Sequence, residues 1–445
     1  MIGSVGKPTW PAIDKITVAG FKSIRDKRSI DVAPLTVLSG ANSSGKSSIM
    51  QAVLLLKQTV EAPYDPGALL LSGPNVRFTS AKQMLSVAAK PGDAAATGFS
   101  VGLGASNEYQ IDLHFSTSKG TQGFSVKKSS VAYRNLHYTL TDNMEHEDLL
   151  QFSPFKELVD RAKMDNQELK LRVTRQRCFL MVSLDWQESD MPRWTVLPGS
   201  VDWDRAIRQI IHIPGLRGNP ERTYARSAVS SFFPGTFDQY VASIIAAWQT
   251  SKNQKQLGQL DAWLEMLGLT SQIRAKSLND TQVELRVGRL LRSRNIVDKD
   301  TVSIADVGFG VSQCLPILVA LLAARPGQLV YVEQPELHLH PKAQVRLVEV
   351  FREAVARGVR LIIETHSLLL LRAIQWAVAE DRLSPKDVKL HWFQRDPKTG
   401  VTDITSADLD EAGAHGDWPN DFAEVALKLE MAYLGAAERK VLGKS

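Results

Sequence analysis

The spacing of apolar residues changes along the chain, and the changes predict successive strands and helices. Residues 15–40 contain KITVAGFKSI and SIDVAPLTVLSG, short apolar or alternating runs of strand character that end at a glycine. In residues 47–59 the apolar positions recur at helical spacing, with no proline or glycine between them. The N-terminal part therefore predicts strand, glycine-rich turn and helix in succession.

The middle of the chain has two different patterns. From about 70 to 210, strand-like segments such as YQIDLHFS and NLHYTLTD alternate with Gly, Ser, Asn and Asp turns. Residues 235–268 have helical patterns, and a strand pair follows near 281–291. We expect these segments to form an inserted β-rich arm followed by a helical and strand arm.

The last third alternates helix, strand, helix and strand in SQCLPILVALLAA, QLVYVEQPE, KAQVRLVEVFREAVARG and VRLIIETHS. This alternation predicts parallel strands with right-handed crossovers, completing the sheet begun by residues 15–40. The expected fold class is α/β, a mixed and mainly parallel sheet flanked by helices and carrying the inserted arm. The expected parts are residues 1–75 and 299–425 for the head, 76–212 for the β-rich arm, 213–298 for the helical arm and 426–445 for a C-terminal helix.

Composition narrows the class of protein. With 445 residues, 44% hydrophobic and 23% charged, the chain can bury a large core and is not fibrous or disordered. Cys178 and Cys314 lie outside any zinc or disulfide spacing, which favours a reducing cytoplasm. The apolar run 314–324 is too short for a membrane span, so we expect no membrane partner. The net charge of +5 permits phosphate-rich ligands, including DNA.

Residues 40–47, GANSSGKS, match the phosphate-binding pattern GxxxxGK[ST] between a predicted strand and a predicted helix. Glycines permit backbone angles that turn successive amides toward phosphate oxygens. Lys46 would bind the β and γ phosphates of ATP, and the Ser47 hydroxyl would ligate Mg²⁺. The residues expected to contact the nucleotide here are Gly40, Asn42, Ser43, Ser44, Gly45, Lys46, Ser47 and Ser48.

A second half-site is expected at residues 329–341, LVYVEQPELHLHP, where an apolar strand is followed by acids. This is the pattern of a Walker B segment, whose carboxylate holds Mg²⁺ through water. Glu333 is the residue that we expect in this role. A strand end with solvated acids is the alternative interpretation.

Four motifs, GANSSGKSS, ADVGFGVSQCLPIL, VEQPELHLHP and ETHS, come in this order. Together they resemble the ABC-type ATPases of the SMC, RecF and overcoming-lysogenization branch, often called AAA-family ATPases. Through GDWPNDF at 416–422, the chain also resembles a compact prokaryotic subgroup of this branch. That subgroup is similar to antiphage-defence ATPases such as Septu PtuA. The likeness covers 15–60 and 300–425, and between them HIPGLR at 212–217 matches in outline.

The resemblance implies that ADVGFGVSQ replaces the ABC signature and contacts the γ-phosphate held by the opposite subunit. Gly308 and Gly310 would permit close backbone approach, and Ser312 would cap a helix beginning near Gln313. ATP would then join two chains in a head-to-tail homodimer. Because the segment departs from the usual LSGGQ-like form, a glycine loop before a buried helix is the alternative.

Three further positions follow from the same resemblance. His366 in ETHS would be the switch histidine beside the attacking water, at a strand end where open α/β sheets bind ligands. Gln83 lies at the usual distance of a Q-loop glutamine. His338 and His340 belong to the D-loop region, and we expect no zinc there because a closed zinc site needs four ligands.

Gln334 departs from the pattern of the family, in which a glutamate usually follows the Walker B acid. An amide cannot accept a proton from the attacking water, so hydrolysis should be slow. Glu336 is a candidate replacement, although strand alternation and Pro335 leave its direction open.

Arg286, Arg289, Arg292 and Arg294 nearly alternate in RVGRLLRSR. They are candidates for a basic edge that contacts DNA, whereas a solvated strand face explains the same pattern.

Three functions fit these expectations. The first is an ATPase that senses a trigger and controls a separate effector, such as a nuclease, in antiphage defence; we expect no nuclease domain after residue 425. The second is a RecF-like or SMC-like ATPase of DNA repair, although the heptads of a long coiled coil are missing. The third is a nucleotide-locked scaffold, as Gln334 suggests. A transporter subunit is disfavoured by the β-rich arm.

Overall fold

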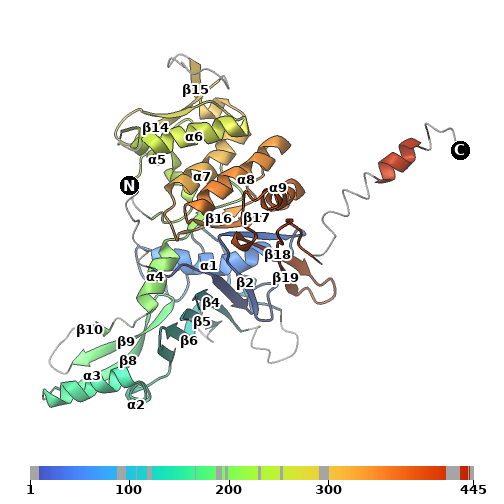
Figure 1. The fold of residues 1–445 in the computed structure, drawn as a ribbon. Helices are drawn as coiled ribbons and strands as arrows, with labels where there is room; N and C mark the ends of the chain where they lie inside the picture. Colours follow the sequence, from blue (N-terminus) through green and yellow to red (C-terminus); the bar gives the residue numbers. More distant parts are fainter. Residues whose placement is uncertain are drawn as a thin grey trace.

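The computed structural model describes residues 10–87, 97–106, 108–117, 123–165, 167–186, 193–195, 199–228, 232–250, 254–289, 300–416, 431–438 and 440. A layered head occupies the middle of the molecule, with a lobe of helices and strands on one side and a projecting arm on the other (Figure 1). The head combines helices with a mainly parallel sheet, which confirms the expected α/β class.

The central sheet of the head has six strands in the order β11-β16-β17-β3-β18-β19. All neighbouring pairs are parallel except the edge pair β18 and β19. The strands of the last third thus join the strand before the phosphate loop, as predicted, whereas the other two strands of residues 15–40, at 15–19 and 28–31, lie in a different sheet. Their bounds are β3 (Leu35–Gly40), β11 (Ile211–Ile213), β16 (Leu329–Glu333), β17 (Arg360–Glu364), β18 (Val388–Arg395) and β19 (Thr402–Asp408).

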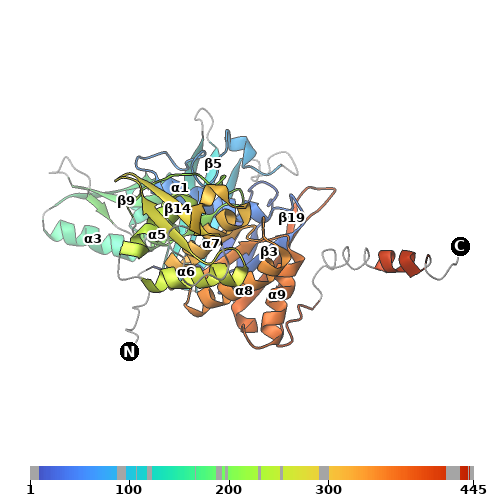
Figure 2. The same ribbon diagram turned by 90° about the horizontal axis from the view of Figure 1, so that it is seen from above.

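Successive residues of the central strands face two different cores, as the period of two requires. In β3, Val37 belongs to the core beneath α7 (Phe309–Ala323), α8 (Pro341–Ala356) and α9 (Leu368–Ala379). Leu38, the next residue, belongs to the core that contains α1 (Lys46–Glu61). Because packing on both faces fixes the strands, the loops at their carboxyl ends have a rigid base (Figures 1 and 2).

A second sheet is antiparallel and lies beside α1, in the order β2-β1-β4-β5-β6-β7. The expected boundary between a head at 1–75 and a β-rich arm from 76 cuts through this sheet, because β1 pairs with β4. Period two identifies the strands, but it does not say which distant strand each one pairs with. The bounds are β1 (Lys15–Ala19), β2 (Arg28–Asp31), β4 (Gly98–Ala105), β5 (Tyr109–Thr117), β6 (Phe124–Tyr133) and β7 (Leu136–Thr141).

The projecting arm and the lobe complete the fold (Figure 1). The arm contains α2 (His146–Leu149), α3 (Ser153–Met164), β8 (Leu169–Gln176), β9 (Phe179–Trp186) and β10 (Arg193–Thr195), and α4 (Ser200–Arg208) follows it. The lobe contains α5 (Val241–Thr250), α6 (Gln254–Leu267), β12 (Tyr224–Ala225), β13 (Ile273–Ser277), β14 (Gln282–Gly288) and β15 (Thr301–Ser303).

Two expectations concern parts of the chain that are described incompletely. Of the C-terminal helix expected over 426–445, residues 431–438 are described and are helical. Within the described ranges, no helix has the length and apolar character needed to cross a membrane.

A buried ion pair fixes the end of α1. Lys57 and Glu61 have side chains that are 0% and 5% exposed, and they are hydrogen bonded to each other. Lys57 also donates to the carbonyl of Phe233 at 3.2 Å, and the Gly235 amide donates to Glu61 at 3.0 Å. Burial lowers the pKa of Lys57 and raises that of Glu61, and their mutual contact opposes both shifts.

Lys57→Met should therefore lower the free energy of unfolding by about 3–5 kcal/mol, because it leaves the Glu61 carboxylate buried and unpaired. Adding Glu61→Gln should recover much of this loss, since the amide oxygen still accepts from Gly235. Urea unfolding of both variants measures the difference. Equal stabilities of the single and double variants would show that the buried charge is not the cause.

Candidate functional site

The phosphate loop runs from the end of β3 to the start of α1, and two glycines shape it. Gly40 has φ 143°, and a Cβ there would clash with the carbonyl oxygen of Phe393. Gly45 has φ 102° and is the N-cap of α1, and a Cβ there would clash with the Thr402 hydroxyl. Only glycine adopts these angles without strain, so the local backbone explains both positions of the motif.

Lys46 lies beneath this loop and is almost fully buried. Its ammonium donates to the carbonyl oxygens of Gly40 at 3.0 Å and Ala41 at 2.7 Å. Burial lowers the pKa of Lys46, and the charges of Glu364 and Glu336 oppose that shift. A phosphate entering the loop would give the ammonium a charged partner in place of two neutral carbonyls, which is a stronger interaction.

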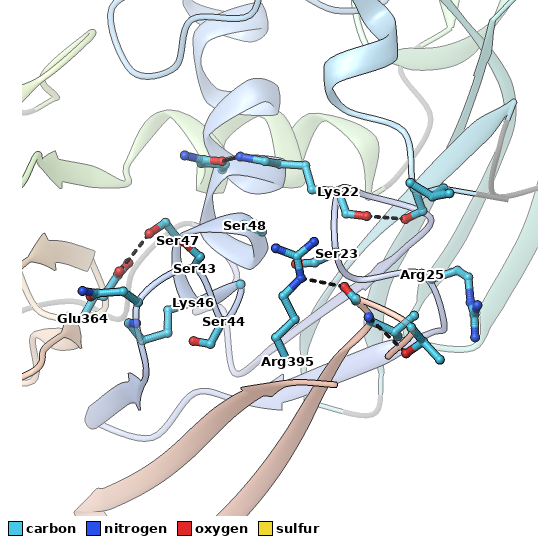
Figure 3. A pocket seen from close by; sticks show the side chains of 18 of the residues that line it. Lys22, Ser23, Arg25, Ser43, Ser44, Lys46, Ser47, Ser48, Glu364 and Arg395 are labelled. Atoms are coloured by element: carbon cyan, nitrogen blue, oxygen red, sulfur yellow. Dashed lines mark hydrogen bonds between the residues drawn. The ribbon is translucent and has the colours of Figure 1, made fainter. Parts of the chain in front are cut away.

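The Ser47 hydroxyl, where Mg²⁺ is expected, donates to Oε1 of Glu364 at 2.8 Å (Figure 3). Glu364 is the last residue of β17 and is 5% exposed. Its Oε2 accepts from the Tyr331 hydroxyl at 2.8 Å. Burial raises the pKa of Glu364, and the hydrogen bonds from Ser47 and Tyr331 oppose the shift. Glu364 was not among the predicted site residues, although an acid ending an apolar strand was a visible signal.

Glu333, at the same level of the neighbouring strand, has other partners. Its carboxylate accepts from the Gly215 amide at 3.0 Å and lies 3.2 Å from Nε2 of His212. Burial raises the pKa of Glu333, but the hydrogen bonds from His212 and Gly215 outweigh it and lower the pKa overall. The role of Glu333 at Mg²⁺ stays a prediction, and Glu364 is the carboxylate hydrogen bonded to Ser47.

Gln334 and His366 line the same pocket as Glu364. Gln334 has φ 45°, a left-handed conformation that costs about 1–3 kcal/mol in a residue other than glycine. The backbone amide of Gln334 donates to the backbone carbonyl of Glu364 at 2.7 Å, which helps to hold this conformation. Burial lowers the pKa of His366, and the charge of Lys46 lowers it further, which favours the neutral form of the ring.

Glu336 lies next to His366 but is not among the residues that line the pocket. Its Oε1 accepts from the His366 amide at 2.9 Å. Its Oε2 is buried and has no hydrogen-bond partner among the described residues. The carboxylate therefore has one oxygen beside His366 that makes no hydrogen bond within the described residues.

The pocket around these residues has a volume of about 700 Å³, which is in the range of small-ligand sites. Lys22, Arg25 and Arg395 line the side away from Glu364 (Figure 3). Together with Lys46 they provide four cations, whereas Glu364 is the single carboxylate among the described lining residues. The pocket thus favours an anion. These three cations were not predicted: Lys22 and Arg25 lie in the turn between β1 and β2, and Arg395 ends β18, far away in the sequence.

The structure does not bring Gln83 into the pocket. Gln83 is exposed in a 3-10 turn, where its side chain accepts from the Thr79 amide at 2.9 Å. Ser86 and Val87 line the pocket instead.

The signature segment forms a helix earlier than expected. Helix α7 begins at Phe309 with Gly308 as its N-cap, so the prediction of a start near Gln313 capped by Ser312 is wrong. Ser312 lies in the first turn, where its hydroxyl donates to the Phe309 carbonyl at 3.1 Å. Because Gly308 has no side chain to cap this turn, the first amides remain open to an anion. A Cβ at Gly310 would lie 3.3 Å from the His338 carbonyl oxygen.

The two D-loop histidines have separate contacts. The ring of His338 lies against Phe309, with centroids 5.7 Å apart. His340 is the N-cap of α8, and its Nδ1 accepts from the Lys342 amide at 3.3 Å.

Of the arginines expected to form a basic edge, one is already paired within the chain. Arg286 donates to the Thr301 carbonyl at 2.6 Å and pairs with Glu284 at 3.0 Å, whereas Arg289 is exposed. Arg292, Arg294 and the segment 417–422 lie outside the described residues.

Comparison with known families identifies the class of the chain. The family described as "AAA domain, putative AbiEii toxin, Type IV TA system" matches residues 35–372, most of the chain and all of the pocket's phosphate loop. The chain belongs to this AAA-domain family. The ATPase class expected from the motifs is thereby confirmed, while the overcoming-lysogenization and Septu subgroup stays a prediction. AAA-domain ATPases use a nucleotide and Mg²⁺ in general, and the oxygens of Ser47 and Glu364 suit a hard cation.

Solved structures similar to this AAA-domain chain include SMC head domains. One, bound to the C-terminal winged-helix domain of ScpA, has a TM-score of 0.48 and 13% identity, covering 90% of this chain and 99% of that chain. The SMC head domain of Thermotoga maritima has a TM-score of 0.41 and 12% identity, with coverages of 89% and 99%. An Smc head bound to the C-terminal domain of ScpA derived from Pyrococcus furiosus has a TM-score of 0.42 and 12% identity. The match covers 95% of this chain and 99% of that chain. Curated proteins gave no match.

Proposed function

We propose that this AAA-domain protein binds ATP with Mg²⁺ at residues 40–48 and hydrolyses it slowly. The observation that carries the proposal is the glycine-shaped loop with Lys46 beneath it and Ser47 hydrogen bonded to Glu364. Ser47 and Glu364 would hold Mg²⁺, which neutralises phosphate charge when bound. Glu333 would instead anchor the loop at Gly215.

Slow turnover follows from the groups near the attacking water. Gln334 orients a water but cannot take its proton. His366 lines the same pocket and can hydrogen bond to that water through its ring. Glu336, with its free buried oxygen, is the remaining base close to His366. A site of this kind retains ATP for long periods.

ATP would also join two chains head to tail. The first turn of α7 has open amides for the γ-phosphate bound by a second copy. Phe309, in this turn, is 50% exposed, and Leu216 in the segment after β11 is 93% exposed. Leu216 directly precedes Arg217, which contacts both α7 and the end of β16.

The nucleotide-controlled dimer would regulate a partner protein, such as an effector nuclease, in antiphage defence. Slow turnover suits a switch better than a motor. The arm formed by α2, α3 and β8–β10 projects from the head and offers a surface away from the nucleotide (Figure 1). The description of the family names a toxin of a toxin–antitoxin system, and such a system also has two components.

Light scattering tests the dimer. The wild-type mass should double on addition of ATP and Mg²⁺, and the mass of Lys46→Ala should not change, because the phosphates lose their main cation.

The effector proposal is tested with the purified protein alone, which should leave DNA intact in the presence of Mg²⁺ or Mn²⁺. Nuclease activity of the chain by itself would refute the division of labour.

A further inference from the structure

Arg217 is a buried arginine that connects two parts of the head. It is 7% exposed and lies between β11 and the lobe. Its guanidinium donates to the carbonyl oxygens of Pro214 at 3.0 Å and Gln313 at 2.8 Å. The same group donates to the carbonyls of Glu333 at 2.7 Å and Gln334 at 3.2 Å. One side chain therefore contacts both α7 and the end of β16.

The contact with α7 is reciprocal. The buried side-chain amide of Gln313 donates to the carbonyls of Arg217 at 3.0 Å and Gly218 at 3.2 Å. The planar, five-donor guanidinium matches this set of carbonyls, whereas a lysine ammonium has three donors and a different geometry. The start of α7 and the end of β16 are thus tied through a single segment.

The two elements act at different places in the proposed dimer. Gln334, at the end of β16, lines the pocket of its own chain. The first turn of α7, just before Gln313, would contact the nucleotide of the other chain. Arg217 itself is not among the residues that line the nucleotide pocket. Its hydrogen bond to the Gln334 carbonyl supports the left-handed backbone that directs this side chain.

We propose that Arg217 is a positioning residue that couples the two nucleotide sites of the dimer. Seating of the α7 turn on one nucleotide sets, through Gln313 and Arg217, the direction of Gln334 at the other. This inference rests on the dimer of the proposed function. It assigns Arg217 a role in cooperativity and in turnover, without any contact to ATP.

Arg217→Met and Arg217→Lys test the coupling, with Arg226→Met as the matched control, since Arg226 is an exposed arginine of the same segment. At protein concentrations too low for the chains to dimerise, all variants should bind ATP with the affinity of the wild type. In the dimer, the Hill coefficient for ATP should lie between 1 and 2 in the wild type and fall to about 1 in Arg217→Met. The kcat of Arg217→Met should fall about 10- to 100-fold at constant KM, because Gln334 is misplaced. Arg217→Lys should be intermediate.

A purely structural arginine would lower the unfolding temperature and leave the Hill coefficient of the folded fraction unchanged. That result, or wild-type kinetics in folded Arg217→Met, would overturn the proposal. If Arg217→Met does not fold, Arg217→Lys decides: a wild-type Hill coefficient and kcat overturn the coupling, and a reduced Hill coefficient supports it. A wild-type chain that binds ATP but stays monomeric would refute the proposed dimer and the coupling with it.

Discussion

Glu364→Gln should weaken metal binding to the ATP complex by at least about 10- to 100-fold, the loss typical when even a group behind a metal ligand is removed. The substitution keeps an acceptor for the Ser47 hydroxyl but removes the negative charge at that oxygen. Electron paramagnetic resonance of Mn²⁺, titrated into protein saturated with ATP, measures the affinity without relying on turnover.

Glu333→Gln is the matched control for this experiment. In the wild type, the Glu333 carboxylate accepts from Gly215 and contacts His212. The variant should therefore lose stability and keep most of its Mn²⁺ affinity. If Glu333→Gln lost Mn²⁺ and Glu364→Gln retained it, the metal would belong to Glu333, as the sequence pattern predicts.

Gln334→Glu should accelerate single-turnover hydrolysis by about 100-fold or more, because a positioned general base contributes 10²- to 10⁴-fold. The side chain keeps its length and its position in the pocket, and it gains the ability to accept a proton. Quenched-flow measurement of phosphate release from a preformed ATP complex follows the chemical step alone.

The slow wild-type reaction should depend on Glu336. Glu336→Gln should lower the residual rate, because it removes the remaining base beside His366. Rapid phosphate release by the wild type, undiminished by Glu336→Gln, would contradict both the slow site and the role of Glu336.

Local patterns of the sequence were sufficient for the phosphate loop and for the elements around it. The strand before Gly40 and the helix after Lys46 lie where the apolar spacing predicts them. The glycines of the motif adopt the strained angles that only glycine tolerates. Both features depend on neighbouring residues, so the sequence contains the information directly.

The order of strands in space was not available from the same patterns. Alternating helices and strands predict a parallel sheet, but they do not say that β17 lies between β3 and β16. This order places Glu364, rather than Glu333, against Ser47. The same limit applies to Arg217, whose partners come from three separate segments.

The start of α7 shows a second kind of limit. Gly308 and Gly310 indicated a loop, whereas the helix begins between them at Phe309. Glycine lowers helix propensity by only about 1 kcal/mol, which the burial of the following apolar residues of α7 outweighs. Tertiary packing therefore determines that α7 begins at Phe309, whereas local propensity predicted a start near Gln313.

Calorimetric titration of ATP with Mg²⁺ into the wild type and into Lys46→Ala tests the central claim most directly. We expect the wild type to take up one nucleotide per chain, and Lys46→Ala to take up none in the same concentration range. No uptake by the wild type, or undiminished uptake by Lys46→Ala, would contradict nucleotide binding at this loop.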